Sequence, residues 1–247
     1  MMPAAKISHV LVAVDFDEAA ASVLSLAGAL AAAGDAELTV FHSSTYDAPA
    51  YFTTAQIEAL EREREQSRAA ISDDLRELAG RYTNRAVRVL VGEGPPQDAI
   101  LRLAPSFDLI AVGTHRRHGP MRWWLGSVAE AIVRHSPRPT LVVPAGAAVP
   151  AAQPALAILA AGADCAACDA WAEVLRAAFG GSISRLPDLL HCAPDGVRNA
   201  DLIVLSVPSA ETHASLNAIV RVLKECVHPV LFVPSVDVVA RESASGR

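Results

Sequence analysis

The stretch His9-Val-Leu-Val-Ala-Val14 is short and almost wholly apolar. Such a run is typical of a strand that is buried on both faces of a parallel sheet. The alanine-rich segment 18–33 that follows predicts a helix, with a cap at Asp17 and a stop at Gly34. Glu37-Leu-Thr-Val-Phe41 predicts the next strand. The chain therefore opens with the strand–helix–strand unit that parallel pairing requires.

The composition limits the classes of protein that this chain can belong to. Hydrophobic residues make up 52% of the 247 residues, and the formal net charge is -6. The acidic balance argues against a nucleic-acid-binding protein. No apolar run approaches the roughly 20 residues that span a bilayer, and the N-terminus carries no signal peptide, so we expect no membrane partner and a cytoplasmic protein. Four cysteines without a secretory signal predict reduced thiols.

The next hundred residues continue the alternation of strands and helices. A long charged segment with an apolar stripe, 54–81, predicts an exposed amphipathic helix. Further strands are predicted at 85–91, 107–112 and 139–144, and further helices at 97–104 and 128–135.

The end of this block is repeated later in the chain. Asp201-Leu-Ile-Val-Leu-Ser206 matches Asp108-Leu-Ile-Ala-Val-Gly113, and His228-Pro-Val-Leu-Phe-Val-Pro234 matches Arg138-Pro-Thr-Leu-Val-Val-Pro144. We interpret the matches as an internal duplication whose second copy is shortened, since it has no counterpart of the long charged helix. The predicted fold class is α/β, with two tandem open twisted parallel sheets flanked by helices. The boundaries are a domain at 1–146, a linker at 147–154, a shortened domain at 155–236 and a flexible tail at 237–247.

In such sheets ligands bind beyond the carboxyl ends of the strands. Asp15, Ser43 and the loop after Gly113 follow three predicted strands. Gly126-Ser127 opens the next helix with a hydroxyl and free backbone N–H groups, which suit a phosphate. The basic loop 114–122 lies between them in sequence. Two simpler interpretations stay open: Gly126-Ser127 only caps its helix, and Asp15 only caps the first helix.

These residues together resemble the universal stress protein family. The resemblance is carried by Val112-Gly-Thr-His-Arg-Arg-His-Gly-Pro-Met-Arg-Trp-Trp-Leu-Gly-Ser-Val-Ala-Glu130 and by Val10-Leu-Val-Ala-Val-Asp-Phe16. It covers about residues 6–146 and is traceable over 155–235. In register with the family's nucleotide motif are Gly113, Gly126 and Ser127. Arg116 stands where that motif has a second glycine. The resemblance implies an adenine nucleotide alpha hydrolase-like, Rossmann-like fold packed as a pseudo-dimer.

The resemblance also implies a ligand and a site. The ligand is an adenine nucleotide, ATP, with Mg²⁺ as a possible companion, and the role is regulatory or signalling in stress response, with at most slow ATP hydrolysis. Asp15 would lie beside the adenine and ribose, and the backbone near Ser43 would border the base. Arg116 would either block the triphosphate or contact it, with Gly119 lending flexibility to the loop. The complete set of implied site residues is Ala13, Val14, Asp15, Ser43, Gly113, Thr114, Arg116, Gly119, Gly126, Ser127 and Val128.

The second half is expected to act as a built-in partner. Gly162 falls where Asp15 would be, and Leu216-Asn217 falls where Gly126-Ser127 would be, so we expect no nucleotide there. By resemblance to the family, the halves would pair through their last strands, Thr140 to Val143 and Val230 to Val233, which would also cover an exposed edge. A homodimer of the whole chain stays open.

Two rival functions are carried forward. One is a nucleotide-free structural or regulatory member of the family whose pocket is closed by Arg116. The other is a thiol-redox or zinc protein built on Cys165 and Cys168, with His191 and Cys192 as further zinc ligands. We favour the interpretation of these cysteines as small apolar residues in an alanine-rich helix.

Overall fold

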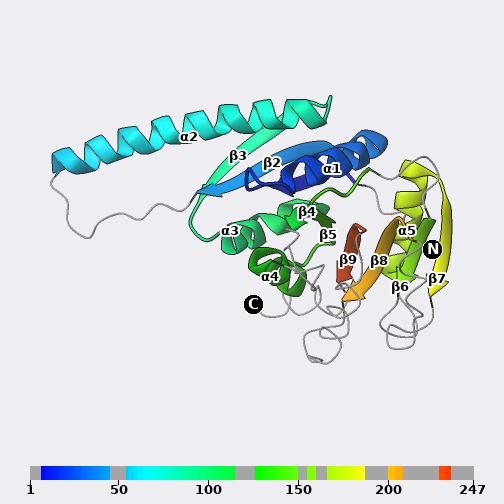
Figure 1. The fold of residues 1–247 in the computed structure, drawn as a ribbon. Coiled ribbons are helices and arrows are strands. Elements are labelled where there is room, and N and C mark those ends of the chain that lie inside the picture. Colours follow the sequence, from blue (N-terminus) through cyan, green and yellow to red (C-terminus); the bar gives the residue numbers. More distant parts are fainter. Residues whose placement is uncertain are drawn as a thin grey trace.

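The computed structural model describes residues 7–44, 54–114, 126–149, 155–159, 166–186, 200–207 and 228–234, and the structural statements below concern these residues. Strands and helices alternate along most of the chain (Figure 1). The strands are β1 (His9–Ala13), β2 (Glu37–Ser44), β3 (Val87–Glu93), β4 (Leu109–Thr114), β5 (Thr140–Pro144), β6 (Ala155–Leu159), β7 (Ser182–Leu186), β8 (Leu202–Val207) and β9 (Val230–Pro234). The α-helices are α1 (Ala20–Gly34), α2 (Thr54–Tyr82), α3 (Pro96–Leu103), α4 (Ser127–His135) and α5 (Ala166–Phe179).

The nine strands form one open sheet in the order β3-β2-β1-β4-β5-β9-β8-β6-β7. Neighbouring strands are parallel, except that β5 and β9 are antiparallel. The predicted α/β class with a mostly parallel, helix-flanked sheet is therefore confirmed. The two sheets expected from the sequence are joined edge to edge, so they form a single sheet.

The junction uses the two strands that the sequence analysis named. Thr140 pairs with Phe232, Leu141 with Leu231, and Val142 with Val230. Leu141 and Leu231 lie in the same hydrophobic core, on one face of the sheet. Val142 and Val230 lie in the core on the other face. Both cores therefore cross the junction without a break.

Helices cover the sheet on both faces (Figure 1). Buried residues of α1, α2 and α5 form one core with alternate residues of the strands, such as Val10 and Val12. Buried residues of α3 and α4 form the other core, which includes Leu11. Strand β1 thus buries successive side chains on opposite faces, as its apolar sequence predicts. No helix in the described part of the chain is both long and apolar enough to cross a membrane.

Aspartates stand at both ends of helix α1. The Asp17 carboxylate accepts hydrogen bonds from the backbone N–H groups of Ala19 (2.7 Å) and Ala20 (3.1 Å), which supports the predicted cap. The helix ends at Gly34, where the sequence predicts its stop, but the residue that takes the left-handed conformation is Asp35, with φ of 50°. Aspartate tolerates this conformation better than most residues.

In each of the two parts of the sheet, an aspartate forms the same pair of hydrogen bonds with the backbone at the start of a neighbouring strand. The Asp108 carboxylate accepts a hydrogen bond from the backbone N–H of His9 (3.0 Å), and the Asp108 N–H donates to the His9 carbonyl (2.9 Å). The Asp201 carboxylate accepts from the Ala155 N–H (2.7 Å), and the Asp201 N–H donates to the Ala155 carbonyl (2.8 Å). The strand order β2-β1-β4-β5 is matched by β7-β6-β8-β9. Matching sequence positions therefore make matching contacts.

The junction predicts a measurable loss of stability. Leu231 is 1% exposed and faces Leu141 across the two strands, so Leu231→Ala leaves a cavity in a core that both parts of the sheet share. We expect the free energy of unfolding, measured by urea titration with circular dichroism, to fall by about 2–5 kcal/mol. The control Ile57→Ala removes an exposed side chain from α2 and should change it by less than about 0.5 kcal/mol. Equal effects of the two substitutions would contradict the shared core.

Candidate functional site

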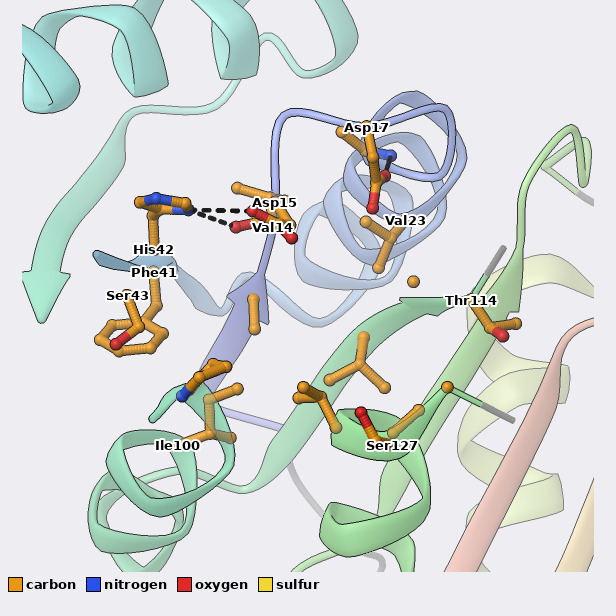
Figure 2. Close-up of a pocket in the computed structure, with 18 residues that line it drawn as sticks. Val14, Asp15, Asp17, Val23, Phe41, His42, Ser43, Ile100, Thr114 and Ser127 are labelled. Atoms are coloured by element: carbon orange, nitrogen blue, oxygen red, sulfur yellow. Dashed lines mark hydrogen bonds and ion pairs between the residues drawn. The ribbon is translucent and has the colours of Figure 1, made fainter. Parts of the chain in front are cut away.

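A cavity of about 370 Å³ opens at the carboxyl ends of β1, β2 and β4 (Figure 2). The beginnings of α1, α3 and α4 complete its wall. Every described residue of the predicted set lines it: Ala13, Val14, Asp15, Ser43, Gly113, Thr114, Gly126, Ser127 and Val128. Arg116 and Gly119 lie outside the described residues. The structure thus brings together, around one space, residues that are more than a hundred positions apart in the sequence.

The two aspartates after β1 have different surroundings. Asp17 holds the start of α1, as described above, and this leaves the capping role with Asp17. The Asp15 side chain is 84% exposed and lies beside His42, with 3.9 Å between Asp15 Oδ1 and His42 Nδ1. The interpretation of Asp15 as a helix cap therefore has no support among the described contacts. Its carboxylate is placed to meet a ligand at the cavity mouth.

The two glycines of the motif differ in what they contact. A Cβ atom added to Gly113 would lie 2.6 Å from the Ala19 Cβ, so Gly113 allows β4 to lie close to the start of α1. Among the described residues, no heavy atom lies within 4 Å of a Cβ atom added to Gly126. Gly126 has φ of -59° and ψ of 156°, which other residues also adopt. Neither the packing of the described residues nor the backbone explains this glycine, which lines the cavity.

Helix α4 points its N-terminus into the same cavity. Gly126 is the N-cap residue, and the first backbone hydrogen bond of the helix runs from the Glu130 N–H to the Gly126 carbonyl. The N–H groups of Ser127, Val128 and Ala129 precede that bond, and all three residues line the cavity. Within the described part of the chain, the Ser127 hydroxyl makes no hydrogen bond that would mark it as a helix cap.

The charge at this helix end favours an anion. The helix dipole places partial positive charge at the N-terminus of α4. Glu130, in the first turn, is engaged by Arg134, with 2.7 Å between Glu130 Oε1 and Arg134 Nη2. The acidic side chain nearest this end in sequence therefore already has a cationic partner. The N–H groups of the first turn lie against the cavity, where an anion can accept from them.

The opposite end of the cavity is mainly apolar. Phe41, Pro96 and Ile100 line it (Figure 2 labels Phe41 and Ile100). The Ser43 hydroxyl donates to the Gly94 carbonyl (2.8 Å), so that side chain is occupied in holding β2 to the loop after β3. The hydroxyl proton of Ser43 is therefore not available to a ligand, whereas its backbone groups are not engaged by this bond.

His42 is a lining residue that the sequence analysis missed. Its Nδ1 lies 2.9 Å from the Val14 carbonyl oxygen, and since a carbonyl only accepts, Nδ1 carries the proton. The side chain is 13% exposed. Phe41, Pro96 and Ile100 were also missed, because their part in the cavity depends on how α3 packs on the sheet. The sequence feature that could have identified His42 is its position next to Ser43, at the end of a predicted strand.

The cysteine hypothesis finds little support in the described part of the chain. Cys168 is 0% exposed and belongs to the core beneath α1 and α5. A buried thiol in apolar surroundings is a small core side chain and not a reactive group. The described residues contain no group of three or more histidine, cysteine and acidic side chains that could hold a metal ion. Cys165, His191 and Cys192 lie outside the described residues.

The matching family model confirms the resemblance seen in the sequence. Residues 6–144 match the model of the universal stress protein family. The match spans more than half of the chain, so the chain belongs to the universal stress protein family. No curated protein matches the chain.

Solved structures agree on the fold. A universal stress protein from Archaeoglobus fulgidus DSM 4304 has 16% sequence identity and a TM-score of 0.66, covering 92% of this chain and 98% of its own. A functionally unknown protein from Pseudomonas aeruginosa PAO1 has 16% identity and a TM-score of 0.60, covering 98% of both chains. A universal stress protein in complex with cAMP has 25% identity and a TM-score of 0.40, covering 57% of this chain and 99% of its own.

Substitution by alanine is expected to have a large effect at Gly113 and almost no effect on stability at Gly126. Gly113→Ala should lower the free energy of unfolding by about 1–3 kcal/mol, because the new methyl group overlaps Ala19. Gly126→Ala should change it by less than about 0.5 kcal/mol, because the methyl group enters open space. As a control, Gly80→Ala in α2, where an added Cβ also meets nothing within 4 Å, should raise it by about 0.5–1 kcal/mol. Thermal and urea unfolding of the three variants measure these changes.

Proposed function

We propose that the N-terminal part of the chain binds an adenine nucleotide, ATP with a divalent ion, and that binding serves a regulatory or signalling role in stress response. The observation that carries the proposal is Gly126, which leaves space at the N-terminus of α4 that neither its backbone conformation nor its packing against the described residues requires. A phosphate group bound against backbone N–H groups needs such space. The argument divides into a phosphate end and a base end.

The phosphate end lies between β4 and α4. Backbone N–H groups of the first turn of α4, the Ser127 hydroxyl and the Thr114 region line this side of the cavity. Backbone N–H groups and hydroxyls donate to phosphate oxygens, and hydrogen bonds to charged groups are stronger than neutral ones. Gly113 supports this end indirectly, since it allows β4 to lie close to the start of α1.

The base end lies beyond β1, along the free edge of β2. The ladder between β1 and β2 ends at the pair Ala13 and Phe41, and the Val14 N–H donates to the Phe41 carbonyl (2.9 Å). In a parallel ladder alternate residues turn their N–H and C=O groups to the same side. The backbone groups of Ser43 therefore face the side that β1 has left. Adenine presents a donor beside an acceptor, which matches one backbone carbonyl and one N–H.

A magnesium ion fits this site as a companion of the phosphates. Among the described lining residues the carboxylates are Asp15, which is exposed, and Asp17, which holds α1. Mg²⁺ commonly binds one or two carboxylates together with substrate phosphates and water. The ion would supply charge that offsets the triphosphate.

Regulation is favoured over catalysis by the surroundings of the polar side chains. Nucleophilic catalysis requires a hydroxyl or thiol that is hydrogen-bonded to a base. His42 donates to the Val14 carbonyl, and Ser43 donates to the Gly94 carbonyl. Both of these described hydrogen bonds therefore go to backbone carbonyls, and neither joins a hydroxyl to a histidine. At most slow hydrolysis by water is expected.

For the second part of the chain we propose a scaffold role, as a shortened duplicate without a nucleotide. The repeated contacts of Asp108 and Asp201 and the repeated strand order support the duplication. Its strand β9 takes the edge of β5 that would otherwise be exposed.

The proposal is tested on the whole protein. Purified protein should show a rise in melting temperature on addition of ATP with Mg²⁺, and its denatured supernatant should release an adenine nucleotide. Ser127→Ala and Asp15→Ala should each raise the Kd for ATP by about tenfold to a hundredfold, as expected for loss of a contact that involves a charged group, which contributes about 1.5–3 kcal/mol. Gly126→Ala should also raise the Kd, because the methyl group fills space at the N-terminus of α4. Ser182→Ala, an exposed serine of β7, is the matched control and should leave the Kd unchanged. Absence of both nucleotide and thermal shift would overturn the proposal.

Arg116 distinguishes this proposal from a nucleotide-free member of the family. If Arg116 closes the pocket, Arg116→Gly should strengthen ATP binding, because glycine restores the family's motif. If Arg116 contacts a phosphate, the same substitution should weaken it. Isothermal titration calorimetry with ATP on the two proteins measures the difference. We expect the Arg116→Gly variant to bind ATP more weakly than the wild type. Tighter binding by the variant would instead support a pocket that Arg116 closes.

A further inference from the structure

Phe16 has a backbone conformation that is unusual for its side chain. Its φ is 33°, in the left-handed region. Bulky residues other than glycine rarely adopt this region, because the Cβ atom approaches the carbonyl oxygen. Strained residues of this kind persist where the surroundings hold them, and they concentrate at functional sites. Phe16 lies between Asp15 and Asp17, which both line the cavity.

The Phe16 side chain is also exposed. Its exposed fraction is 47%, the largest among the exposed large hydrophobic residues of the described part of the chain. Burial of an aromatic ring stabilises a protein and can offset the energetic cost of a strained backbone. Because about half of the Phe16 ring is exposed, hydrophobic packing alone does not explain the strain. Burial of the ring therefore does not offset the strain at Phe16.

Among the described residues, the Phe16 ring makes an aromatic contact with His42. The two ring centroids are 5.1 Å apart and the planes meet at 65°, an edge-to-face arrangement. His42 is fixed on its other side by the hydrogen bond from Nδ1 to the Val14 carbonyl. His42 lines the cavity, so Phe16 stands against the outer side of a lining residue.

His42 lies on the side of β2 opposite to Phe41, because side chains alternate along a strand. Figure 2 shows His42 on one side of the strand, and the Phe41 ring and Ser43 on the other. A flat group that meets the backbone edge of Ser43 would therefore lie between two walls. Phe41 and Ile100 form one of these walls, in the core under α3 and α4. His42 forms the other wall.

We propose that the His42 ring, held on its outer side by Phe16, forms an aromatic wall that packs on the base of the bound nucleotide, so that Phe16 is the positioning residue that makes binding depend on the base. This inference rests on the proposed function. The chemistry recognised is a planar aromatic base, in addition to the polar edge that the Ser43 backbone reads. Phosphates bound at α4, at the other end of the cavity, should not depend on Phe16.

The experiment compares ATP with inorganic tripolyphosphate, which has the phosphates without the base. Kd values are measured by calorimetry for the wild-type protein, Phe16→Ala, Phe16→Leu and Phe16→Gly. We expect Phe16→Ala and Phe16→Gly to weaken ATP binding by about threefold to tenfold, the size of one aromatic contact, and to leave tripolyphosphate binding unchanged. Phe16→Leu should lie between. Tyr82→Ala removes another exposed aromatic ring, at the end of α2, and is the matched control.

The outcomes separate the two proposals. ATP binding by the wild type that is unchanged in Phe16→Ala and Phe16→Gly would overturn the aromatic wall and leave the proposed function standing. Equal weakening of ATP and tripolyphosphate would also overturn it, because Phe16 would then act on the whole site. A wild type that binds no ATP would overturn both. Phe16→Gly guards against loss of folding, because glycine adopts the left-handed conformation readily and should keep or raise the melting temperature.

Discussion

The antiparallel pairing of β5 with β9 is the interaction on which the rest of the structure depends. It joins a five-stranded and a four-stranded parallel arrangement into one sheet. Because the pairing is in register, the side chains of both strands continue the two hydrophobic cores across the junction. The helices α1 and α5 then share one core, although they come from different parts of the chain. An edge that parallel pairing would leave open is covered within the same molecule.

The cavity shows a division of labour between residues that stabilise the fold and residues that face a ligand. Asp17 and Gly113 serve the protein itself, the first as a cap of α1 and the second by admitting close packing. Asp15 and Gly126, which accompany them in the motif, have no comparable structural task in the described part of the chain. A motif recognised from sequence is therefore a mixture, and only the three-dimensional contacts separate its two components.

Much of the fold and of the cavity lining followed from the sequence, for definable reasons. Apolar runs such as 9–14 identify buried strands, and the ends of parallel strands meet at one edge, so Asp15, Ser43 and Gly113 were expected together. Sequence reasoning missed His42 and Ile100, since the packing of neighbouring elements brings them to the cavity. It predicted the stop of α1 at Gly34 but not the left-handed conformation of Asp35, because composition favours glycine where the local geometry selected an aspartate. The sequence predicted that the last strands of the two halves pair, but it did not predict that this pairing joins all nine described strands into one sheet.

Helix α1 carries a consequence for how this chain can change over time. From Ala20 to Ala31 its residues are buried or partly buried, and only its last turn is exposed. The helix packs against strands of the first part, against α2 and against α5. A helix without a water-facing side constrains every neighbour at once. Removal of α5 would expose apolar side chains of α1, and an exposed apolar surface of this kind is prone to aggregation.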